Sequence, residues 1–281
     1  MKKMSSIKKV VKQVFINYFE HNVGKNAAAL AYYLLFAIFP LLIFISNFLG
    51  LLDLDVHSIT RYLGRILPPD IVNIVETYLD HITYTSNHVL LWFSLVFSIW
   101  FPMRAVRGLM ADVRRAYELE EPKKPIAYAV KQFLYTVVFL VVIVLTLFLS
   151  VLGENVLGYI NNNLPQNWHI SEYLLEIWQY LRFVIVAFLM LFSIGSLYSF
   201  ALDKRPPVKK ILPGIFGALL SWMVVSVGFS FYAENFANYS IIYGTLGAVM
   251  VLLVWLYMTA LVLILGAELN AAIQKFSVKK N

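Results

Sequence analysis

The sequence predicts an all-α membrane protein: a polytopic six-transmembrane-helix bundle with an N-terminal interfacial amphipathic helix and an extracellular amphipathic helical hairpin. The first observation is composition, since 60% of the 281 residues are hydrophobic and only 14% are charged, against about 25% charged in soluble domains. The second is that several uncharged runs exceed the roughly 20 residues that cross a bilayer. The third is that Lys and Arg crowd alternate connections between these runs.

We predict a single membrane domain over residues 1–281, with a cytoplasmic amphipathic arm at 1–25 and an outer helical hairpin at 53–88. The predicted transmembrane helices are 27–52, 89–107, 132–152, 173–202, 211–233 and 241–271. The chain has no cysteine, which excludes disulfides, thiolate catalysis and cysteine metal ligands. The first apolar run is longer than the core of a signal peptide, so we expect it to be retained.

The N-terminal arm carries apolar residues at helical spacing from Ile7 to Phe19, and Lys8, Lys9 and Lys12 occupy the other side. A basic amphipathic helix beside a first span is typical of a helix that lies in the membrane interface. We therefore predict that these lysines contact lipid headgroups, anionic ones in particular, and not nucleic acid.

The first two spans carry their own signals. The first opens with the small residues Ala27 and Ala31, and Pro40 near its middle predicts a kink, which is either a hinge or a matter of shape. The second span is short and is interrupted by a proline near its end, after which Arg104 and Arg107 follow one turn apart. We interpret this pair as an orientation signal that contacts lipid phosphates, with a substrate-headgroup clamp as the alternative.

The fourth span contains Arg182, a basic residue deep in an apolar run, and Ser193 and Ser196 share its helical face. A charge at that depth is costly and should face the bundle interior or water. Arg182 also lies only about two to three turns from the outer end, so its side chain could snorkel to the interface. A substrate-contacting role and a structural role are both open.

The last two spans carry stripes of small residues, which allow transmembrane helices to approach closely. These predicted packing residues are Gly214, Ala218, Gly244, Ala248 and Gly266. Asn270 falls in the same stripe of the last span, whereas Glu268 faces the other way. We expect the last helix to lie inside the bundle, and Glu268 could carry a proton or a cation.

A short connection between the fifth and sixth spans gathers Glu234, Asn238, Tyr239 and Tyr243 at one outer edge of the predicted bundle. The orientation follows from the 23 Lys and Arg residues, of which twenty lie in segments on one side, two on the other and Arg182 within a span. The positive-inside rule then places both termini in the cytoplasm.

Three segments resemble the signatures of the YihY/BrkB membrane family: NAAALAYYLLFAIFPLLI at Asn26–Ile43, SIWFPMRAVRGLMADVRRAYELE at Ser98–Glu120, and YGTLGAVMVLLVWLYMTALVLILGAELNAAI at Tyr243–Ile273. The resemblance covers nearly the whole chain. It implies a six-span protein of the bacterial cytoplasmic (inner) membrane. Some relatives carry a ribonuclease label and others a virulence or serum-resistance label, and the family supplies no agreed catalytic residues.

Function is weighed from the residues. Hydrolytic RNA cleavage needs clustered carboxylates and histidines, but the five histidines are scattered, so we expect no nuclease or other enzyme activity, no metal and no cofactor. A transporter or lipid translocator is the leading interpretation, and an envelope scaffold or partner subunit, alone or as a homo-oligomer, is the alternative. The predicted cavity or substrate-contacting residues are Arg182, Ser193, Ser196, Glu234, Asn238, Tyr239, Tyr243, Glu268 and Asn270.

Overall fold

The computed structural model describes residues 2–51, 72, 88–120, 122, 124–151, 172–203, 206–235 and 245–278. These residues form seven α-helices and, within the described ranges, no strand. The helices are α1 (Lys2–Glu20), α2 (Val23–Leu51), α5 (His88–Ala116), α6 (Pro125–Val151), α8 (Glu172–Ala201), α9 (Val208–Asn235) and α11 (Thr245–Val278). The all-α prediction is confirmed.

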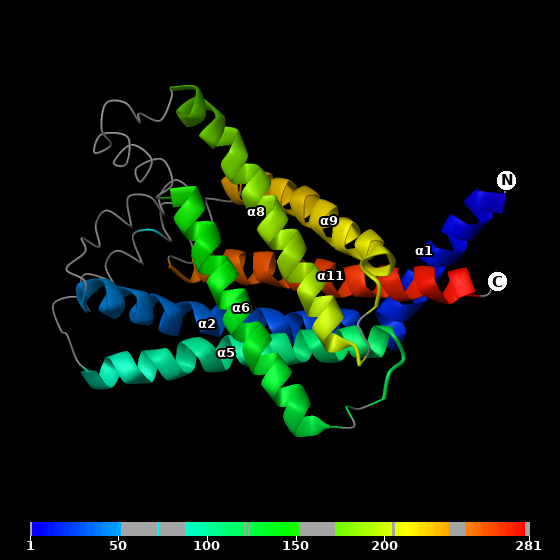
Figure 1. Ribbon diagram of the computed structural model, residues 1–281, viewed down its shortest axis with the longest axis horizontal. Coiled ribbons are helices and arrows are strands. Elements are labelled where there is room, and N and C mark those ends of the chain that lie inside the picture. The colour runs from blue at the N-terminus through cyan, green and yellow to red at the C-terminus, as the bar shows by residue number, and fades with distance from the viewer. Residues whose placement is uncertain are drawn as a thin grey trace.

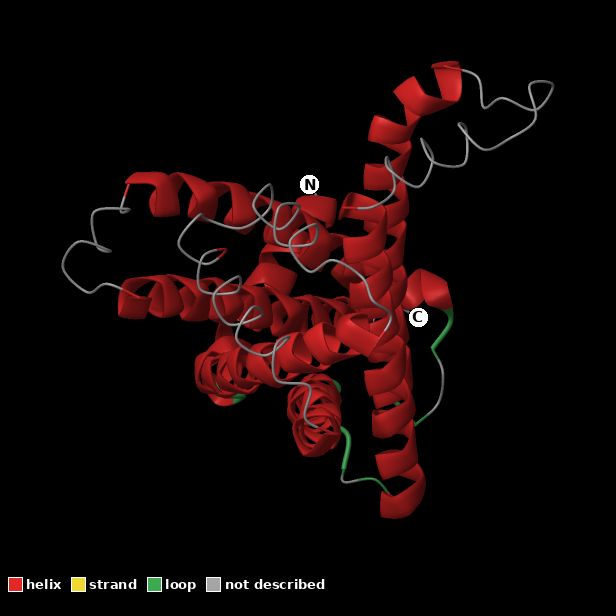
Figure 2. Cartoon of the chain, turned by 90° about the vertical axis from the view of Figure 1, so that its left-hand side faces the viewer, coloured by secondary structure: helices red, strands yellow, loops and turns green. Residues whose placement is uncertain are grey.

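The six helices after α1 have 27 to 34 residues each and alternate in direction along the molecule, so that both chain termini lie at the same end (Figure 1). Figure 2 shows the described part almost entirely as helix, with a few short stretches of loop. A helix of 27 residues rises about 40 Å, enough to cross the hydrocarbon core of a bilayer. Alternation brings the Lys- and Arg-rich ends of the helices together at the end where the termini lie.

Five helices are long and apolar enough to cross a membrane: Val23–Phe44, Pro125–Thr146, Tyr180–Ala201, Val208–Tyr232 and Leu246–Ser277. The chain is therefore a multi-pass membrane protein. The remaining predicted span, 89–107, lies in α5, which is not among these five. Its second half contains several charged residues, Arg104 and Arg107 among them. The six-span count stays a prediction.

Helix α5 is longer than the predicted span 89–107, since it continues through Pro102 to Ala116. The proline removes one backbone hydrogen bond, but it does not end the helix. The reason is packing: Val106, Met110 and Val113 repeat at helical spacing beyond the proline and are all buried.

The N-terminal arm does form a helix, α1, and this helix packs against α11 and α2. Val11, Phe15 and Phe19 stay exposed on it, at 61%, 66% and 63% of their surface. A position in the membrane interface remains a prediction. The predicted outer hairpin 53–88 lies outside the described residues, apart from the buried Val72 and His88 at the start of α5.

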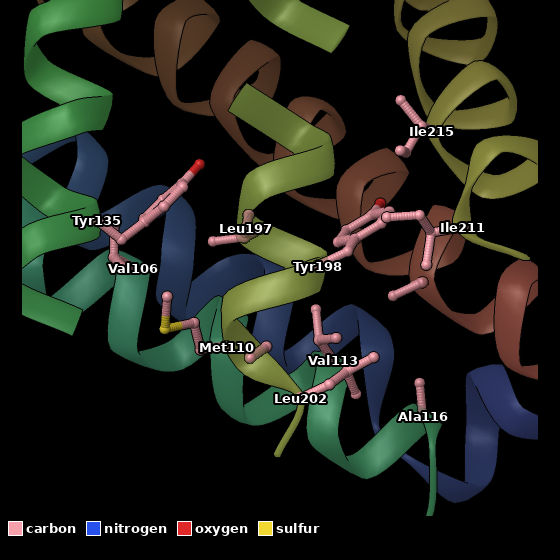
Figure 3. Close-up of a cluster of buried hydrophobic side chains, with 12 residues drawn as sticks. Val106, Met110, Val113, Ala116, Tyr135, Leu197, Tyr198, Leu202, Ile211 and Ile215 are labelled. Carbon is pink, nitrogen blue, oxygen red and sulfur yellow. The ribbon is translucent and has the colours of Figure 1, made fainter. Parts of the chain in front are cut away.

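The largest buried cluster joins α5, α6, α8, α9 and α11 (Figure 3). Tyr198 lies at its centre, fully buried, and its hydroxyl donates to the carbonyl of Leu263 at 2.6 Å. Figure 3 shows its ring between Leu197 and Ile211. The hydroxyl needs this partner because a buried polar group without one is costly.

Most predicted packing residues lie in helix interfaces. Ala27 and Ala31 are buried on α2, and Pro40 is half-buried within it. Gly214, Ala218 and Gly266 lie where α9 and α11 approach most closely: a Cβ added to Gly266 would lie 2.8 Å from both the Cβ of Ala218 and the carbonyl oxygen of Gly214. Ala248 is half-buried in α11, and Gly244 lies outside the described residues.

Candidate functional site

A polar cluster occupies the end of the bundle where the termini lie, and Glu268 of α11 is its centre. Glu268 is fully buried. The side-chain amide of Asn17 donates to its Oε2 at 2.7 Å, and His21 Nδ1 lies 2.6 Å from its Oε1. A carboxylate can only accept hydrogen bonds, so the Nδ1–H of His21 donates. Both oxygens of Glu268 are therefore held by the N-terminal part of the chain.

The turn between α1 and α2 places His21 against Glu268. Helix α1 ends at Glu20, and the chain changes direction in a turn at His21 and Asn22 before α2 begins at Val23. Asn22 has a φ of 53°, the left-handed conformation that asparagine tolerates better than most residues. The backbone N–H of His21 still donates to the carbonyl of Asn17 at 2.9 Å, which continues the helical bonding into the turn.

A second buried carboxylate, Asp112 of α5, adjoins the same turn. It accepts hydrogen bonds from the amide of Asn26 at 2.7 Å and from Arg115 at 2.8 Å. The Asn26 amide also donates to the carbonyl of His21 at 3.1 Å, so it connects Asp112 to the turn. Burial raises the pKa of Asp112 to about 6, with a smaller contribution from the charge of Glu268, against the opposing effects of Arg115 and Asn26.

This arrangement concentrates charge in a low-dielectric region. Two carboxylates, Glu268 and Asp112, are buried together, and the half-buried His21 and the partly exposed Arg115 are the adjacent cationic groups. Buried carboxylates are costly unless they are paired or protonated. Within the described ranges no three His, Cys, Asp or Glu side chains are arranged to hold a metal ion. The chemistry that these residues can perform is uptake and release of a proton.

A separate ion pair closes the same end of the bundle between α5 and α8. Arg114 is 5% exposed, bonds to Asp203 at 2.7 Å and to the carbonyl of Ala201 at 3.1 Å, and lies over the ring of Tyr128 at 5.4 Å. A guanidinium held on two sides and over an aromatic face is fixed in position. This residue entered the sequence analysis only as part of the charge count.

A groove of about 500 Å³ lies between α1, α9 and α11. Its lining consists almost entirely of apolar residues, with Ser221 and the hydroxyl of Tyr18 as the exceptions: Val11, Val14, Phe15, Tyr18, Phe19, Gly217, Ser221, Val262, Leu265, Gly266 and Leu269. Lys8, Lys9 and Lys12 are exposed on the same helix α1. Gly266 belongs to this lining and to the close contact of α9 with α11.

The predicted site residues do not come together as one site. Asn270 is fully buried on α11, where its Oδ1 accepts from the backbone N–H of Gly214 at 2.6 Å and its amide donates to the carbonyl of Ile211 at 2.8 Å. On α8, Ser193 is buried, and the hydroxyl of Tyr135 donates to its carbonyl at 2.9 Å.

Ser196 donates to that same carbonyl of Ser193 at 2.9 Å, and Arg182 is half-buried further along α8. Arg104 is exposed on α5 with its guanidinium 5.1 Å from the ring of Trp100, and Arg107 is exposed as well. The remaining predicted residues cannot be placed: the side chain of Glu234, and Asn238, Tyr239 and Tyr243, lie outside what the structure describes.

Sequence reasoning selected Glu268 but missed its partners Asn17 and His21, and also Asn26 and Asp112. A weak signal was present for two of them. Asn17 interrupts the apolar face of the N-terminal arm, and Asp112 falls on the helical stripe of Ala105, Leu109 and Ala116, which is otherwise apolar. His21 and Asn26 flank a helix boundary, where polar residues are ordinary and carry no such signal.

Comparisons with known proteins bear on the whole chain. The family described as Virulence factor BrkB matches residues 14–281. YfkH of Bacillus subtilis (strain 168), which carries a ribonuclease-like name, is 28% identical over 94% of this chain and 95% of its own length. A UPF0761 membrane protein of Pseudomonas aeruginosa (strain LESB58) is 27% identical over 87% of this chain but 57% of its own length. No solved structure matches the chain.

Proposed function

The chain belongs to the Virulence factor BrkB family, and from that premise we propose that it is a transporter that translocates an anionic lipid or related amphiphile in the bacterial cytoplasmic membrane. The proposal includes six spans, with α5 as the one that composition alone does not select, and both termini in the cytoplasm. The observation that carries it is the apolar groove between α1, α9 and α11.

The size and lining of this groove suit an acyl chain. Its volume of about 500 Å³ falls within the roughly 300–1,000 Å³ of small-molecule sites. Phe15 and Phe19 on one side and Leu265 and Leu269 on the other offer hydrocarbon without a strong hydrogen-bonding group. Lipid chains would gain contact with these side chains, whereas a polar solute would lose its hydration there.

The cations beside the groove favour an anionic headgroup. Lys8 lies one turn before Val11 on α1, Lys12 follows Val11 directly, and Lys209 and Lys210 are exposed in the first turn of α9. Each such lysine contributes about 1 kcal/mol of attraction to an anionic membrane surface. Arg104 and Arg107 on α5 would contact headgroups at the same membrane face.

Translocation can be tested in proteoliposomes that contain fluorescent phosphatidylglycerol. The measured quantity is the fraction of the fluorescence that an added membrane-impermeant quencher removes. The change is Ser221→Trp, which places an indole in the groove and is expected to slow translocation at least about tenfold. Leu220→Trp is the matched control, because Leu220 is 60% exposed on α9 and outside the groove lining. Equal rates for both variants, or a natural chain no faster than empty vesicles, would contradict the proposal.

An envelope scaffold is the second candidate. It is favoured by the way in which Asn270, Ser193 and Ser196 are engaged with backbone groups inside the bundle. In that case no lipid or anion would cross faster in the presence of intact protein. Neither candidate includes an enzymatic step, and we do not extend the ribonuclease-like name of the Bacillus protein to this chain.

A further inference from the structure

We propose that Glu268 and His21 form a proton-binding tether that docks α1 on α11 and thereby sets the position of one wall of the groove. The tether consists of Asn17 and His21 on the N-terminal side and Glu268 on α11. The claim that this movement regulates translocation rests on the proposed function. The claim that the tether docks α1 is independent of it.

Helix α1 is docked by polar contacts together with partly buried apolar side chains, Tyr18 among them. Among its described side chains, residues 8–20, Asn17 is the one that is buried. Val11, Phe15 and Phe19 are more than half exposed, so their contribution to docking is small. The bonds of Asn17 and His21 to Glu268, at 2.7 and 2.6 Å, join residues 251 and 247 positions apart in the chain. These bonds join the last turn of α1 and the turn that follows it to α11.

The tether needs Glu268 to be ionised. A proton on Glu268 would turn one of its oxygens into a donor, facing either the amide of Asn17 or the N–H of His21. As the side chain of Asn17 is placed, its N–H group faces Glu268 and its Oδ1 accepts from Gln13 at 2.7 Å, so Asn17 presents no acceptor to that proton. A proton added to Glu268 while His21 is a cation therefore meets N–H donors on both sides and removes at least one of the two bonds that hold α1.

The charge of His21 also matters. With one proton shared by the pair, His21 is a cation beside a carboxylate and the hydrogen bond is charge-assisted. If that proton leaves, the neutral ring can still donate, but the buried charge of Glu268 loses its counter-ion. Docking is therefore strongest with one proton on the pair and weakens when a second proton is added.

Other charged groups surround the pair on every neighbouring element. Asp112 of α5 is a second carboxylate, and the charge of Glu268 contributes to raising the pKa of Asp112. Arg115 of α5 donates to Asp112 and reaches the carbonyl of His21 at 3.4 Å, which opposes this effect. Glu118 lies near His21 but is exposed and is paired with Lys275 of α11 at 2.8 Å. On α2, Asn26 faces the turn with a neutral amide.

Release of α1 would open the groove, because five of its residues line that groove: Val11, Val14, Phe15, Tyr18 and Phe19. The facing walls on α9 and α11 are joined independently through Asn270 and the close glycine contact, so they would stay in place. Protonation would thus move one wall against two fixed ones, on the side of the bundle where Lys8 and Lys12 lie.

The chain has no cysteine, so spin labels can be placed at Lys9→Cys on α1 and Lys209→Cys on α9 without background. Distances between them would be measured by pulsed electron resonance in nanodiscs from about pH 8 to about pH 5, a range that includes the charge change of an unperturbed histidine. Glu268→Gln keeps the shape and removes the carboxylate, and His21→Gln is a second variant. Glu118→Gln is the matched control, since it removes an exposed carboxylate that also lies near His21.

The ratio of short to long distances is expected to fall about fivefold on acidification in the natural chain and in Glu118→Gln. Glu268→Gln is expected to show the long distances at every pH, and His21→Gln to lose the pH response. A natural chain with no pH response, or a full response in Glu268→Gln, would overturn the proposal. Because no substrate is present, failure here is distinguishable from failure of lipid translocation.

Discussion

Glu268 and Asn270 lie two residues apart on α11, and both are fully buried, yet they face different neighbours. Asn270 bonds to backbone groups of α9, the N–H of Gly214 and the carbonyl of Ile211. Glu268 bonds to the side chains of Asn17 and His21. Backbone partners neither ionise nor rotate away, whereas a histidine does both. A buried polar residue is therefore structural on one face of this helix and responsive to protonation on the other.

The packing also differs between the Asn270 face and the Glu268 face of α11: it is closer on the Asn270 face. On the Asn270 face, α9 approaches so closely that a Cβ on Gly214 would overlap the carbonyl oxygen of Gly266. On the Glu268 face, α1 buries Asn17 and leaves three large apolar residues largely exposed. Close packing holds α9 in one position relative to α11. A helix such as α1, which is held by a few polar bonds and packs more loosely, can adopt a docked and a released position. Four substitutions test this contrast.

Gly214→Ala is expected to have the largest effect, because its methyl group would meet the backbone of α11 and the side chain of Asn270. Backbone cannot move aside as a side-chain end can, so α9 and α11 must separate. We expect a loss of about 3 kcal/mol of stability, read from thermal unfolding in detergent. Gly228→Ala on the same helix is the control, since nothing lies within 4 Å of its added Cβ. Equal effects of the two changes would show that the close contact does not stabilise the bundle.

Asn270→Leu removes both hydrogen bonds on this face and leaves the N–H of Gly214 without the partner that it has here. We expect a loss of about 2 kcal/mol, the cost of an unsatisfied buried group. The loss should be the same between about pH 5 and pH 8, because neither partner titrates in that range. A stability loss that varied with pH would contradict the assignment of Asn270 as purely structural.

Asp112→Asn tests the polar cluster on the Glu268 face of α11 through the pH dependence of the protein's stability. Burial raises the pKa of Asp112 from 3.8 to about 6, so the folded state binds a proton more tightly than the unfolded state. This contribution to stability is full below the unfolded pKa and is lost as the pH rises through about 6. Asparagine avoids that loss but weakens the contact with Arg115. We expect equal unfolding midpoints at about pH 5 and a variant about 1 kcal/mol more stable at about pH 8.

If Asp112→Asn were instead less stable at the higher pH, the ion pair of Asp112 with Arg115 would outweigh the cost of burying the carboxylate. The cluster on the Glu268 face would then be structural, like the contacts on the Asn270 face. The same measurement on Asn270→Leu supplies the pH-independent reference.

Glu118→Gln should have the smallest effect. Its bond to Lys275 lowers the pKa of Glu118, but both side chains are exposed. Exposed ion pairs contribute from nothing to about 1 kcal/mol, and salt screens them. We expect less than about 0.5 kcal/mol in low salt and no effect near 1 M salt. A larger, salt-independent loss would place this pair among the contacts that hold the end of the bundle.

The helices could be predicted because length, hydropathy and spacing are local properties of the chain. The predicted span 211–233 compares with α9 at Val208–Asn235, and 27–52 with α2 at Val23–Leu51. The end of α5 was missed because Pro102 and the following arginines looked like a boundary, and only tertiary packing explains its continuation to Ala116.

The polar cluster could be predicted only in part. A carboxylate within an apolar run identified Glu268, but its partners come from a segment about 250 residues earlier, and no local pattern connects the two. The prediction that the N-terminal arm lies in the membrane interface did not draw attention to Asn17 as a partner of another helix. Asn270 was chosen on the same polar grounds as Glu268, and only the identity of its partners separates a structural amide from an ionisable pair.

Hydrogen exchange of the protein in nanodiscs, followed by mass spectrometry at about pH 8 and about pH 5, tests both faces of α11 in one experiment. After correction for the intrinsic pH dependence of exchange, protection of the α1 amides should fall on acidification in the natural chain and be low at both pH values in Glu268→Gln. Protection of the first turns of α9, next to Asn270, should be the same in all four samples. Unchanged protection of α1, or loss of protection at both faces together, would contradict the distinction between the two faces.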